Sequence, residues 1–324
     1  MDKLAEIRRP IEQELADYQQ LFRSLFATED ALLAEALNHV RQRSGKMMRP
    51  MLVLLMAKAF EGVTEKSHQC AAVLELLHTA SLLHDDVVDE SDERRGQPSL
   101  NAVQGNRVAI LVGDFMLSCA LHVAALTGDL SVVDFVANLG ATLSAGEVKQ
   151  IENTRSNKYD ESAYFHVIKN KTASLFATCA RFGAMTGNAS PEMLEKAVRV
   201  GELIGICFQI RDDIFDYYAD GKIGKPTGND MAEGKLTLPA LYALQHTDDD
   251  DLHARAAHVK AGTATPDDIA TLVDFTKRAG GIEYARDKML AFHAEAADIL
   301  DTHFQGPVGD ALRAYLDYTV ERDN

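Results

Sequence analysis

Two short acidic stretches contain the residues of this chain that are best suited to chemistry. Each stretch follows an apolar pattern with helical spacing and carries three aspartates at positions i, i+1 and i+4. They are Asp85, Asp86 and Asp89 in the first stretch, and Asp212, Asp213 and Asp216 in the second. Residues four apart on a helix share a face, whereas adjacent residues are rotated by about 100°. Two carboxylates on one face are suitable ligands for hard divalent cations, which prefer oxygen.

The repetition of this pattern is the main argument for a metal site. One acidic helix end is usually only solvated surface, because short motifs often match by chance. Like charges four apart also destabilise a helix by about 0.2–0.5 kcal/mol per pair, so a cation is expected to offset them. We therefore predict that both acidic motifs take part in binding divalent metal.

The charge balance limits the classes of partner. The 324-residue chain has a formal net charge of −16. Nucleic acids and anionic membrane surfaces both require a basic face on the protein, so neither is expected as a partner. A ligand that contains phosphate would have to bind at a local cluster of basic residues.

The chain shows no sign of a membrane or secretory segment. Its N-terminal stretch, MDKLAEIRRPIEQELADYQQ, lacks the apolar core of a signal peptide and has an amphipathic helical pattern. No apolar run approaches the roughly 20 residues that span a bilayer, and the longest is Met51 to Ala57. We expect no integral membrane segment and a cytoplasmic location. The cysteines occur singly in apolar helical contexts, which favours buried thiols over disulfides or zinc ligands.

Helical patterns extend over nearly the whole chain. Strand-like alternation is absent, and short breakers separate segments rich in Ala, Leu, Glu and Met. The predicted helices cover residues 3–25, 28–42, 49–60, 65–90, 101–126, 129–153, 160–186, 191–219, 235–246, 266–279, 281–302 and 308–321. No Pro- or Ser-rich linker divides the chain, so the prediction is a single all-α domain over 1–324, a large bundle of long helices.

Basic residues are scarce, and most of those near the acidic motifs occur in four clusters. The clusters contain Lys46 and Arg49, then Arg94 and Arg95, then Lys169 and Lys171, and finally Lys222, Lys225 and Lys235. Arg presents a planar fork to phosphate oxygens and Lys a point charge. For Lys171, inside a predicted helix, two interpretations stay open: the side chain extends from the core to solvent, or it contacts a ligand.

These features together fit one type of ligand. Carboxylates with bound cations, next to basic clusters, form a site for a polyanion, and diphosphate is the natural candidate. The long helices that lead to the acids are apolar, so the other end of the ligand is expected to be apolar. Departure of a diphosphate needs charge stabilisation by metals and by Arg or Lys. The carbocation that remains needs a dry apolar pocket.

With these residues in view, the chain resembles the trans-isoprenyl diphosphate synthases. The strings that carry the resemblance are GKMMRP, HTASLLHDDVVDESDERRG, GDFML, KTASLF, FQIRDDIFDY and GKPTGNDMAEGKLTLP. They look closest to the bacterial long-chain, octaprenyl-like members, and they cover about Ser44 to Leu241 in the family's order. The resemblance implies an all-α bundle around a central cavity and a homodimer.

The resemblance also implies a role for each site residue. Two Mg²⁺ ions would bind Asp85 and Asp89 and a third would bind Asp212, with Asp86, Asp213 and Asp216 in support. The allylic diphosphate would bind Arg94, Lys171, Lys225 and Lys235, with Thr172 and Gln209 facing the reacting centre. Isopentenyl diphosphate would bind Lys46, Arg49, His78 and Arg95. Met47 departs from the family pattern, which often has Arg there, and this weakens the isopentenyl assignment.

The implied reaction begins with Mg²⁺-assisted ionisation of the allylic diphosphate. The isopentenyl double bond then attacks, and a proton is lost to the released pyrophosphate. Three alternatives stay open. A short-chain farnesyl or geranylgeranyl diphosphate synthase would use the same motifs, and a class I terpene cyclase ionises a similar substrate, although its second metal motif usually contains Asn, Ser or Glu. A non-catalytic subunit of a heteromeric synthase would lack the acidic motifs, whereas both are intact here.

Product length is expected to depend on residues about one helical turn before the first acidic motif. Ala80 and Ser81 lie five and four residues before Asp85, where a growing chain would pass. Short-chain members of the family place a bulky aromatic residue there, so Ala and Ser predict a long product. By resemblance, Phe135 is the favoured floor of the tunnel, with ordinary core packing as the competing interpretation.

Overall fold

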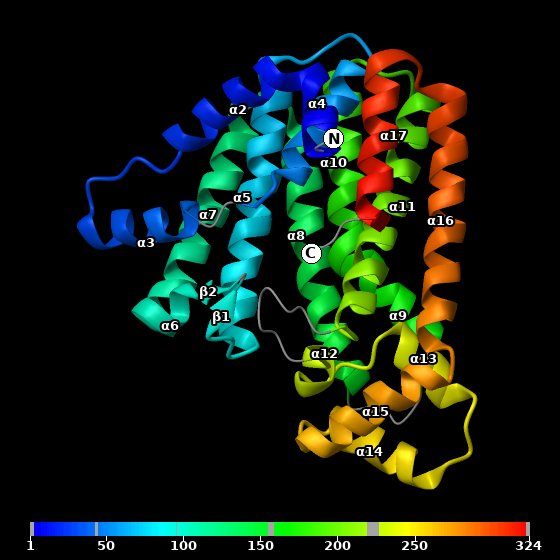
Figure 1. The fold of residues 1–324 in the computed structure, drawn as a ribbon. Helices are drawn as coiled ribbons and strands as arrows, with labels where there is room; N and C mark the ends of the chain where they lie inside the picture. Colours follow the sequence, from blue (N-terminus) through cyan, green and yellow to red (C-terminus); the bar gives the residue numbers. More distant parts are fainter. Residues whose placement is uncertain (1–2, 43–44, 95, 155–158, 219–226, 322–324) are drawn as a thin grey trace. The chain divides into compact units, whose positions relative to one another are not determined.

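Helices make up nearly all of the regular structure, as the computed structural model of this protein shows (Figure 1). The structure describes residues 3–42, 45–94, 96–154, 159–218 and 227–321. The elements are α1 (Lys3–Arg8), η1 (Arg9–Ile11), α2 (Glu12–Ser24), α3 (Ala31–Arg41), α4 (Met48–Lys58), α5 (Glu65–Val88), β1 (Glu93–Arg94), β2 (Gln97–Pro98), α6 (Leu100–Gln104), α7 (Asn106–Leu126), α8 (Leu130–Thr154), α9 (Glu161–Ile168), η2 (Lys169–Ala173), α10 (Ser174–Thr186), α11 (Pro191–Phe215), α12 (Asn229–Ala232), α13 (Leu238–Gln245), α14 (Asp250–Lys260), α15 (Pro266–Arg278), α16 (Gly281–His303) and α17 (Gly306–Glu321). The predicted all-α class is confirmed.

Several predicted boundaries were wrong. Gly105, with a φ of +82°, divides the predicted helix 101–126 into α6 and α7. The predicted helix 160–186 contains one π-helical segment, η2. Helix α14 was not predicted at all, although Asp249 accepts hydrogen bonds from the amides of its first turn and so caps it. The two-residue strands β1 and β2 form a short antiparallel hairpin that the sequence pattern did not indicate.

The chain divides into two units. Unit 1 contains Met1–Gly140, Leu175–Gly201 and Leu300–Tyr315, and unit 2 contains Ala141–Ser174, Glu202–Ile299 and Leu316–Asn324. The first acidic motif belongs to unit 1 and the second to unit 2. The single domain over 1–324, and the approach of the two motifs to one another, therefore stay predictions.

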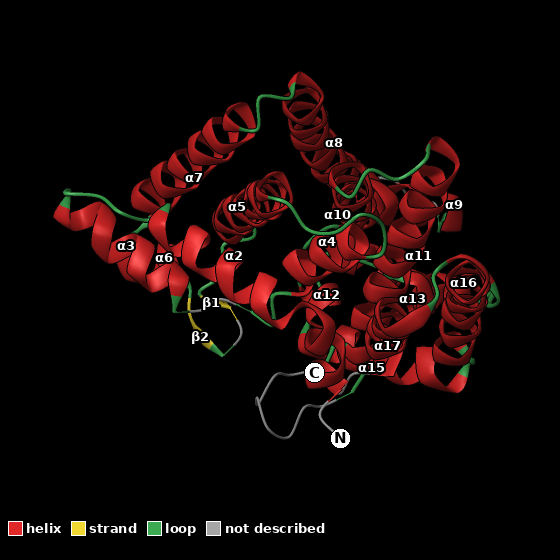
Figure 2. Cartoon of the chain, turned by 90° about the horizontal axis from the view of Figure 1, so that it is seen from above, coloured by secondary structure: helices red, strands yellow, loops and turns green. Residues whose placement is uncertain are grey.

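Helix α5 lies at the centre of unit 1 and carries the first acidic motif at its C-terminal end. Thr64 and Ser67 form a capping box that starts the helix. Figure 2 looks along α5 and shows α2, α4 and α7 around it. The predicted core segment Met51 to Ala57 has no exposed side chain. Helix α10 packs closely on this segment, because a Cβ at Gly183 would lie only 2.4 Å from the carbonyl oxygen of Val53.

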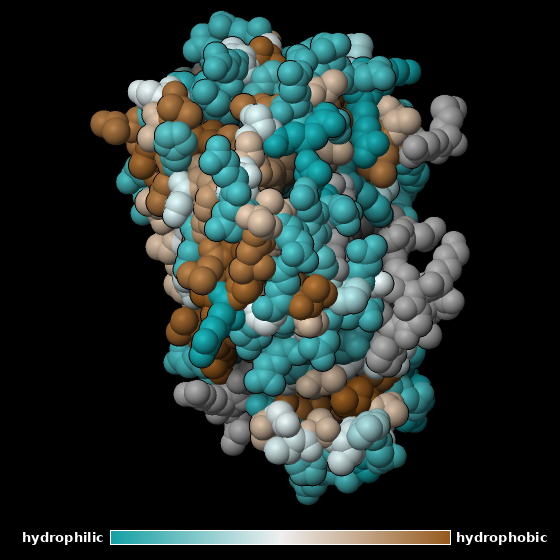
Figure 3. All heavy atoms as spheres, turned by 90° about the vertical axis from the view of Figure 1, so that its left-hand side faces the viewer, coloured by the Kyte–Doolittle hydropathy of each residue, from teal (hydrophilic) through white to brown (hydrophobic). Residues whose placement is uncertain are grey.

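Helix α7 of unit 1 is apolar on several sides but only partly covered. An 18-residue window within it has a mean hydropathy of 1.9, and 39% of that window is buried. By length and composition it could cross a membrane, and the sequence analysis overlooked it because the isolated Asp114 interrupts its apolar run. The exposed apolar side chains on it are Ile110, Leu111, Leu121 and Leu126. Figure 3, which faces the side of Figure 1 where α7 lies, shows apolar atoms gathered there.

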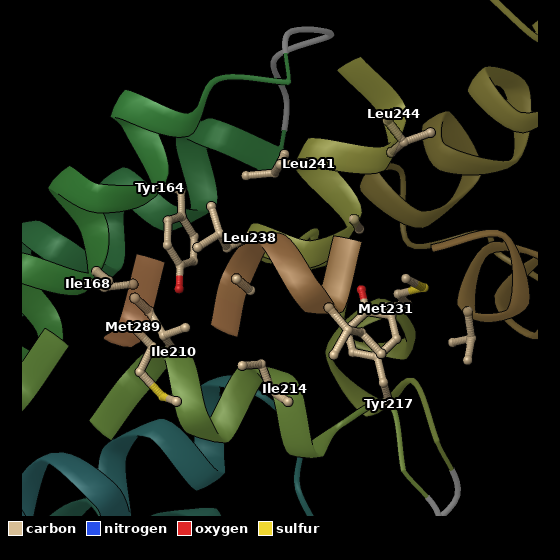
Figure 4. Close-up of a cluster of buried hydrophobic side chains, with 14 of the residues drawn as sticks. Tyr164, Ile168, Ile210, Ile214, Tyr217, Met231, Leu238, Leu241, Leu244 and Met289 are labelled. Carbon is tan, nitrogen blue, oxygen red and sulfur yellow. The ribbon is translucent and has the colours of Figure 1, made fainter. Parts of the chain in front are cut away.

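An apolar cluster in unit 2 holds the second acidic motif in place (Figure 4). Ile210 and Ile214 are buried on α11, Tyr217 is buried just after the helix ends, and all three belong to one cluster with side chains of α9 and α13. The spacing of four residues puts Ile210 and Ile214 on one face of the helix. Because that face is buried, Asp212, about 200° around the helix from Ile210, lies on the opposite side.

Candidate functional site

The first acidic motif occupies the last turn of α5. Asp85 and Asp89 are half-buried and share a face, and Asp89 is the C-terminal capping residue of the helix. Glu90, with a φ of +50°, adopts the left-handed conformation that ends many helices. The helix therefore stops at the motif and leaves two carboxylates side by side at its end.

The middle acid of this motif has different surroundings. Asp86 is only 2% exposed, and its Oδ1 accepts a hydrogen bond of 2.6 Å from Nε of Arg94 in the hairpin. Asn101 donates from Nδ2 to the backbone oxygens of Asp86 and Ser91, at 3.3 and 3.1 Å. The hairpin and α6 thus bind the end of α5, and Arg94, a predicted diphosphate ligand, is held by the acidic motif itself.

The neighbouring motif GDFML contacts α5 one residue before Asp85. A Cβ at Gly113 would lie 2.3 Å from Nε2 of His84, so glycine makes room for the imidazole. The same nitrogen lies 3.4 Å from a carboxylate oxygen of Asp114. This contact gives Gly113 a packing role. It assigns no ligand to the motif GDFML.

The predicted isopentenyl diphosphate residues are only partly brought together among the described residues. His78 and Arg94 line a cavity of about 80 Å³ in unit 1. Neither Lys46 nor Arg49 lines this cavity. Lys46 is exposed, and the guanidinium of Arg49 lies 5.3 Å from the ring centre of Phe176. The cavity also has residues that the sequence analysis missed, namely Phe22, Phe26, His39, Arg41 and Glu75. Arg95 lies outside the described residues.

The middle acid of the second motif repeats the surroundings of the first. Asp213 is 2% exposed, with the Tyr164 hydroxyl donating to its Oδ2 at 2.5 Å and Nε2 of Gln209 donating to its Oδ1 at 2.8 Å. Figure 4 shows the Tyr164 hydroxyl pointing toward α11. The Thr172 hydroxyl in turn donates to Oε1 of Gln209 at 2.7 Å. Burial raises the pKa of Asp213 to about 7, although both hydrogen bonds act in the opposite direction.

Lys171 and Thr172 lie in the π-helical segment η2. The backbone of this segment packs on α8, because a Cβ at Gly146 would come within 3.3 Å of the Lys171 nitrogen. The Lys171 ammonium forms an ion pair with Glu147 of α8. Its side chain is only 27% exposed, so it belongs to a polar interior site and does not simply extend to solvent.

The last acid of the second motif binds the backbone that follows the motif. Oδ1 of Asp216 accepts from the Asn229 amide at 2.9 Å, and Oδ2 accepts from the Asp230 amide at 3.1 Å. These bonds anchor the start of α12, and the Lys235 amide donates to the Asp230 carbonyl at 2.7 Å. Lys225 lies outside the described residues, so its predicted role is not placed.

A cavity of about 430 Å³ in unit 2 collects many of the predicted residues. Its lining includes Lys171, Thr172, Gln209, Asp213 and Lys235, all of which the sequence analysis selected. Its lining also includes polar residues that were missed, namely Lys149, Gln150, Asp160, Tyr164, Asp230 and Lys260. Asp230 lies within one of the strings that carry the family resemblance. Tyr164 lies in no recognisable motif, so only the fold shows its contact with Asp213. Asp212 and Asp216 do not line this cavity.

The residues predicted to set product length are all in unit 1. Ala80 is completely buried, and the Ser81 hydroxyl donates to the His78 carbonyl at 2.8 Å. Phe135 packs edge-on against Phe182 at 6.1 Å between ring centres, with the Arg181 guanidinium 4.9 Å from its ring. These contacts describe ordinary packing, and a role for Phe135 as a tunnel floor stays a prediction.

The carboxylates of the acidic motifs fit Mg²⁺ better than a metal ion whose ligands all come from the protein. Within the described ranges, no group of three or more His, Cys, Asp or Glu side chains is arranged to hold a metal ion. Mg²⁺ is usually bound by only one or two carboxylates, with waters and substrate phosphates as the other ligands. The half-buried pair Asp85 and Asp89 fits that requirement.

Known proteins resemble this chain over nearly its whole length. The sequence pattern of the polyprenyl synthetase family matches residues 30–276. A nonaprenyl diphosphate synthase from Mycobacterium tuberculosis is 34% identical over 311 residues, which cover 95% of this chain and 92% of that protein. The crystal structure of a geranylgeranyl pyrophosphate synthase from Bacteroides thetaiotaomicron is 46% identical with a TM-score of 0.88, and the match covers 99% of this chain and 100% of that one. A polyprenyl synthase from Caulobacter crescentus, complexed with calcium and isoprenyl diphosphate, is 26% identical with a TM-score of 0.92 and 98% coverage of both chains.

Proposed function

Because the chain belongs to the polyprenyl synthetase family and is a prenyltransferase, we propose that it joins isopentenyl diphosphate head-to-tail to an allylic diphosphate. The product is an all-trans, long-chain, octaprenyl-like diphosphate, and pyrophosphate is released. The observation that supports this most directly is the unit 2 cavity, where two predicted diphosphate ligands, Lys171 and Lys235, lie beside Thr172 and Gln209. The wall also contains apolar side chains, with Val167, Ile168, Leu236 and Leu241 among them.

The side chains of the protein supply charge stabilisation and a dry pocket. Mg²⁺, held by Asp85 and Asp89 and by Asp212, would neutralise the departing diphosphate as three ions with substrate bound. Calcium accompanies isoprenyl diphosphate in the Caulobacter structure, which supports a divalent cation at the corresponding site. Arg94, Lys171, Lys225 and Lys235 would bind the allylic diphosphate. No protein side chain has to act as a nucleophile or a general base.

Isopentenyl diphosphate would bind through Lys46, Arg49, His78 and Arg95. In support, Nε of Arg49 is buried without a hydrogen-bond partner among the described residues, which leaves a donor for an anion. His78 lies in the unit 1 cavity with Arg94. Isopentenyl diphosphate and Arg94 would then meet next to the first acidic motif.

The product is proposed to be long because the positions before the first acidic motif hold small residues. Ala80 and Ser81 put little volume where the family's short-chain members place an aromatic ring. The nonaprenyl relative supports a long product, whereas the structural neighbour from Bacteroides carries a geranylgeranyl name and keeps the short-chain alternative open. Product analysis decides between them.

We also propose a homodimer, in the cytoplasm. Helix α7 exposes Ile110, Leu111, Leu121 and Leu126 although it is long and apolar. An exposed apolar face of this kind usually marks a surface that another protein covers. A second copy of the chain is the proposed occupant, as the family resemblance implies.

The function is tested with the purified chain, Mg²⁺, isopentenyl diphosphate and farnesyl diphosphate, followed by mass spectrometry of the extracted products. A ladder that ends near octaprenyl diphosphate is expected. Farnesyl diphosphate alone should give no cyclic hydrocarbon. A class I terpene cyclase would form one without isopentenyl diphosphate, so a cyclic product would favour that alternative. Absence of any elongated product from the chain alone would show that it is a subunit that needs a partner.

A further inference from the structure

Helix α14 contributes its last residue, Lys260, to the wall of the unit 2 cavity. The strings that carry the family resemblance end before this helix begins at Asp250, so the resemblance assigns no role to it. Lys260 is half-buried and lines the cavity together with Lys171 and Lys235, two predicted diphosphate ligands. The cavity wall therefore contains a cation that neither the motifs nor the predicted helices indicated.

The end of α14 packs directly against the turn that carries Lys235. A Cβ at Gly234 would lie 3.2 Å from the carbonyl oxygen of Val259, so the two backbones are close together there. Gly234 has a φ of +80°, a left-handed conformation that glycine adopts without strain. Lys235 and Lys260 are the next residues along the two segments, and both line the cavity. The two lysines therefore reach the cavity from adjoining segments.

Tyr159, just before α9, supports the Lys260 side chain. The Lys260 ammonium lies 5.0 Å from the centre of the Tyr159 ring, within the range of a cation–π interaction. His253 of α14 stacks on the same ring with the ring centres 5.4 Å apart, and Nε2 of Gln245 donates to the Tyr159 carbonyl. These contacts restrict the ring, and the ring in turn restricts the lysine. An ammonium has three N–H donors, so this contact leaves donors for an anion.

Partial burial makes the Lys260 ammonium a better partner for an anion. Burial lowers the pKa of this lysine, because the charged form has lost part of its hydration. An anion that binds there restores a favourable interaction for the charge, and it does so in surroundings of lower dielectric constant than water. Lys235 brings a second positive charge to the same cavity. Two like charges on adjoining segments favour a polyanion, and a diphosphate can contact both.

We propose, on the basis of the proposed function, that Lys260 is a further ligand for the diphosphate group in the unit 2 cavity, where it acts together with Lys235. The diphosphate belongs to the allylic substrate or to the pyrophosphate that the reaction releases, and the two present the same phosphate chemistry to the lysine. Tyr159 is a positioning residue that acts through Lys260. The competing explanation is that Lys260 only ends α14, where a cation interacts favourably with the helix dipole.

Lys277 provides a matched control for that explanation. It lies in the last turn of α15 with its ammonium 5.6 Å from the ring centre of Tyr218, but it does not line the cavity. Isothermal titration calorimetry with inorganic pyrophosphate and Mg²⁺ measures binding without turnover. Lys260→Gln should raise the Kd by about tenfold, in line with the loss of one charge-assisted contact, whereas Lys277→Gln should change it by less than about twofold. Lys260→Arg keeps the charge and should stay within about threefold of wild type.

Steady-state kinetics with farnesyl diphosphate show which diphosphate Lys260 contacts. If the KM rises by about tenfold along with the Kd for pyrophosphate, the contact already exists in the substrate complex. If the KM is unchanged and only pyrophosphate binding weakens, the contact belongs to the released product. Tyr159→Leu should weaken pyrophosphate binding by about threefold in the wild-type background and by less than about 1.5-fold in the Lys260→Gln background, because the ring acts through the lysine.

Pyrophosphate binding that is as tight in folded Lys260→Gln as in wild type, or that weakens as much in Lys277→Gln as in Lys260→Gln, would overturn the proposal. So would an active wild-type chain that binds no pyrophosphate. A Tyr159→Leu effect of equal size in both backgrounds would remove its positioning role. Melting temperatures check that each variant is folded. Failure of the wild-type chain to make any prenyl product would instead refute the proposed function, and calorimetry would still decide whether Lys260 binds a diphosphate.

Discussion

At the level of single side chains, Asp85 and Asp212 are half-buried carboxylates at corresponding positions of the two motifs. We expect Asp85→Ala and Asp212→Ala each to abolish turnover, because each removes a predicted Mg²⁺ ligand. Both variants should remain folded, since neither side chain belongs to an apolar core. Steady-state rates and thermal melting curves measure the two effects. Wild-type activity in either folded variant would remove that residue from the metal site.

Ser81 is the residue for which a larger side chain should shorten the product. It is half-buried on α5, one turn before the first acidic motif. Ser81→Phe should end elongation near farnesyl or geranylgeranyl diphosphate, because the ring would occupy the proposed path of the chain. Chromatography of the products shows the outcome. An unchanged product length in an active variant would contradict the tunnel assignment.

At the level of elements, the contact between α5 and α7 depends on a glycine. A methyl group at Gly113 would overlap the His84 imidazole, and overpacking of this kind costs about 1–3 kcal/mol. Gly113→Ala should therefore destabilise the protein in chemical denaturation. In a His84→Ala background the same change should be neutral or stabilising, since the overlap is gone and Ala is the better helix former by about 1 kcal/mol. Equal losses in both backgrounds would show that His84 is not the obstacle.

The start of α8 offers a pH-dependent test of a helix cap. Asp129 accepts hydrogen bonds from the amide and hydroxyl of Ser131 and from Lys66, and these lower its pKa to about 2. Asp129→Ala should reduce the free energy of unfolding by about 1 kcal/mol, the usual cost of losing a cap. Because the folded pKa is depressed, the contribution is complete above about pH 4 and is lost as the pH falls toward 2. Urea titrations of both proteins across this range should therefore converge at low pH.

At the level of the whole molecule, the exposed face of α7 predicts the oligomeric state. Leu111 is 67% exposed, so Leu111→Glu should leave the monomer folded and prevent association. Light scattering should give about twice the chain mass of 35.5 kDa for wild type and the single chain mass for the variant. Leu290→Glu, at a 46% exposed position of α16, is the matched control and should stay dimeric. A monomeric wild type would refute the proposed dimer.

The sequence by itself determined the fold class and most helices, and it predicted the chemistry of the site. Helical periodicity depends on local spacing, and two copies of an i, i+1, i+4 aspartate pattern can be recognised without knowing what they contact. The motif strings also carried the family resemblance, which the comparisons confirmed. Local signals failed at Gly105, at η2 and at α14, where a break, a π-helical segment and an isolated helix left no strong periodicity.

Only the tertiary structure decided which member of each aspartate motif is buried and what it holds. Asp86 and Arg94 are eight residues apart, and Asp213 and Tyr164 are 49 apart, so the second contact in particular cannot be inferred from spacing. The same holds for Glu147 beside Lys171 and for the room that Gly113 leaves for His84. The physical reason is that a hydrogen bond or a steric limit depends on distances between elements, and the chain sets those distances only when its helices have packed together.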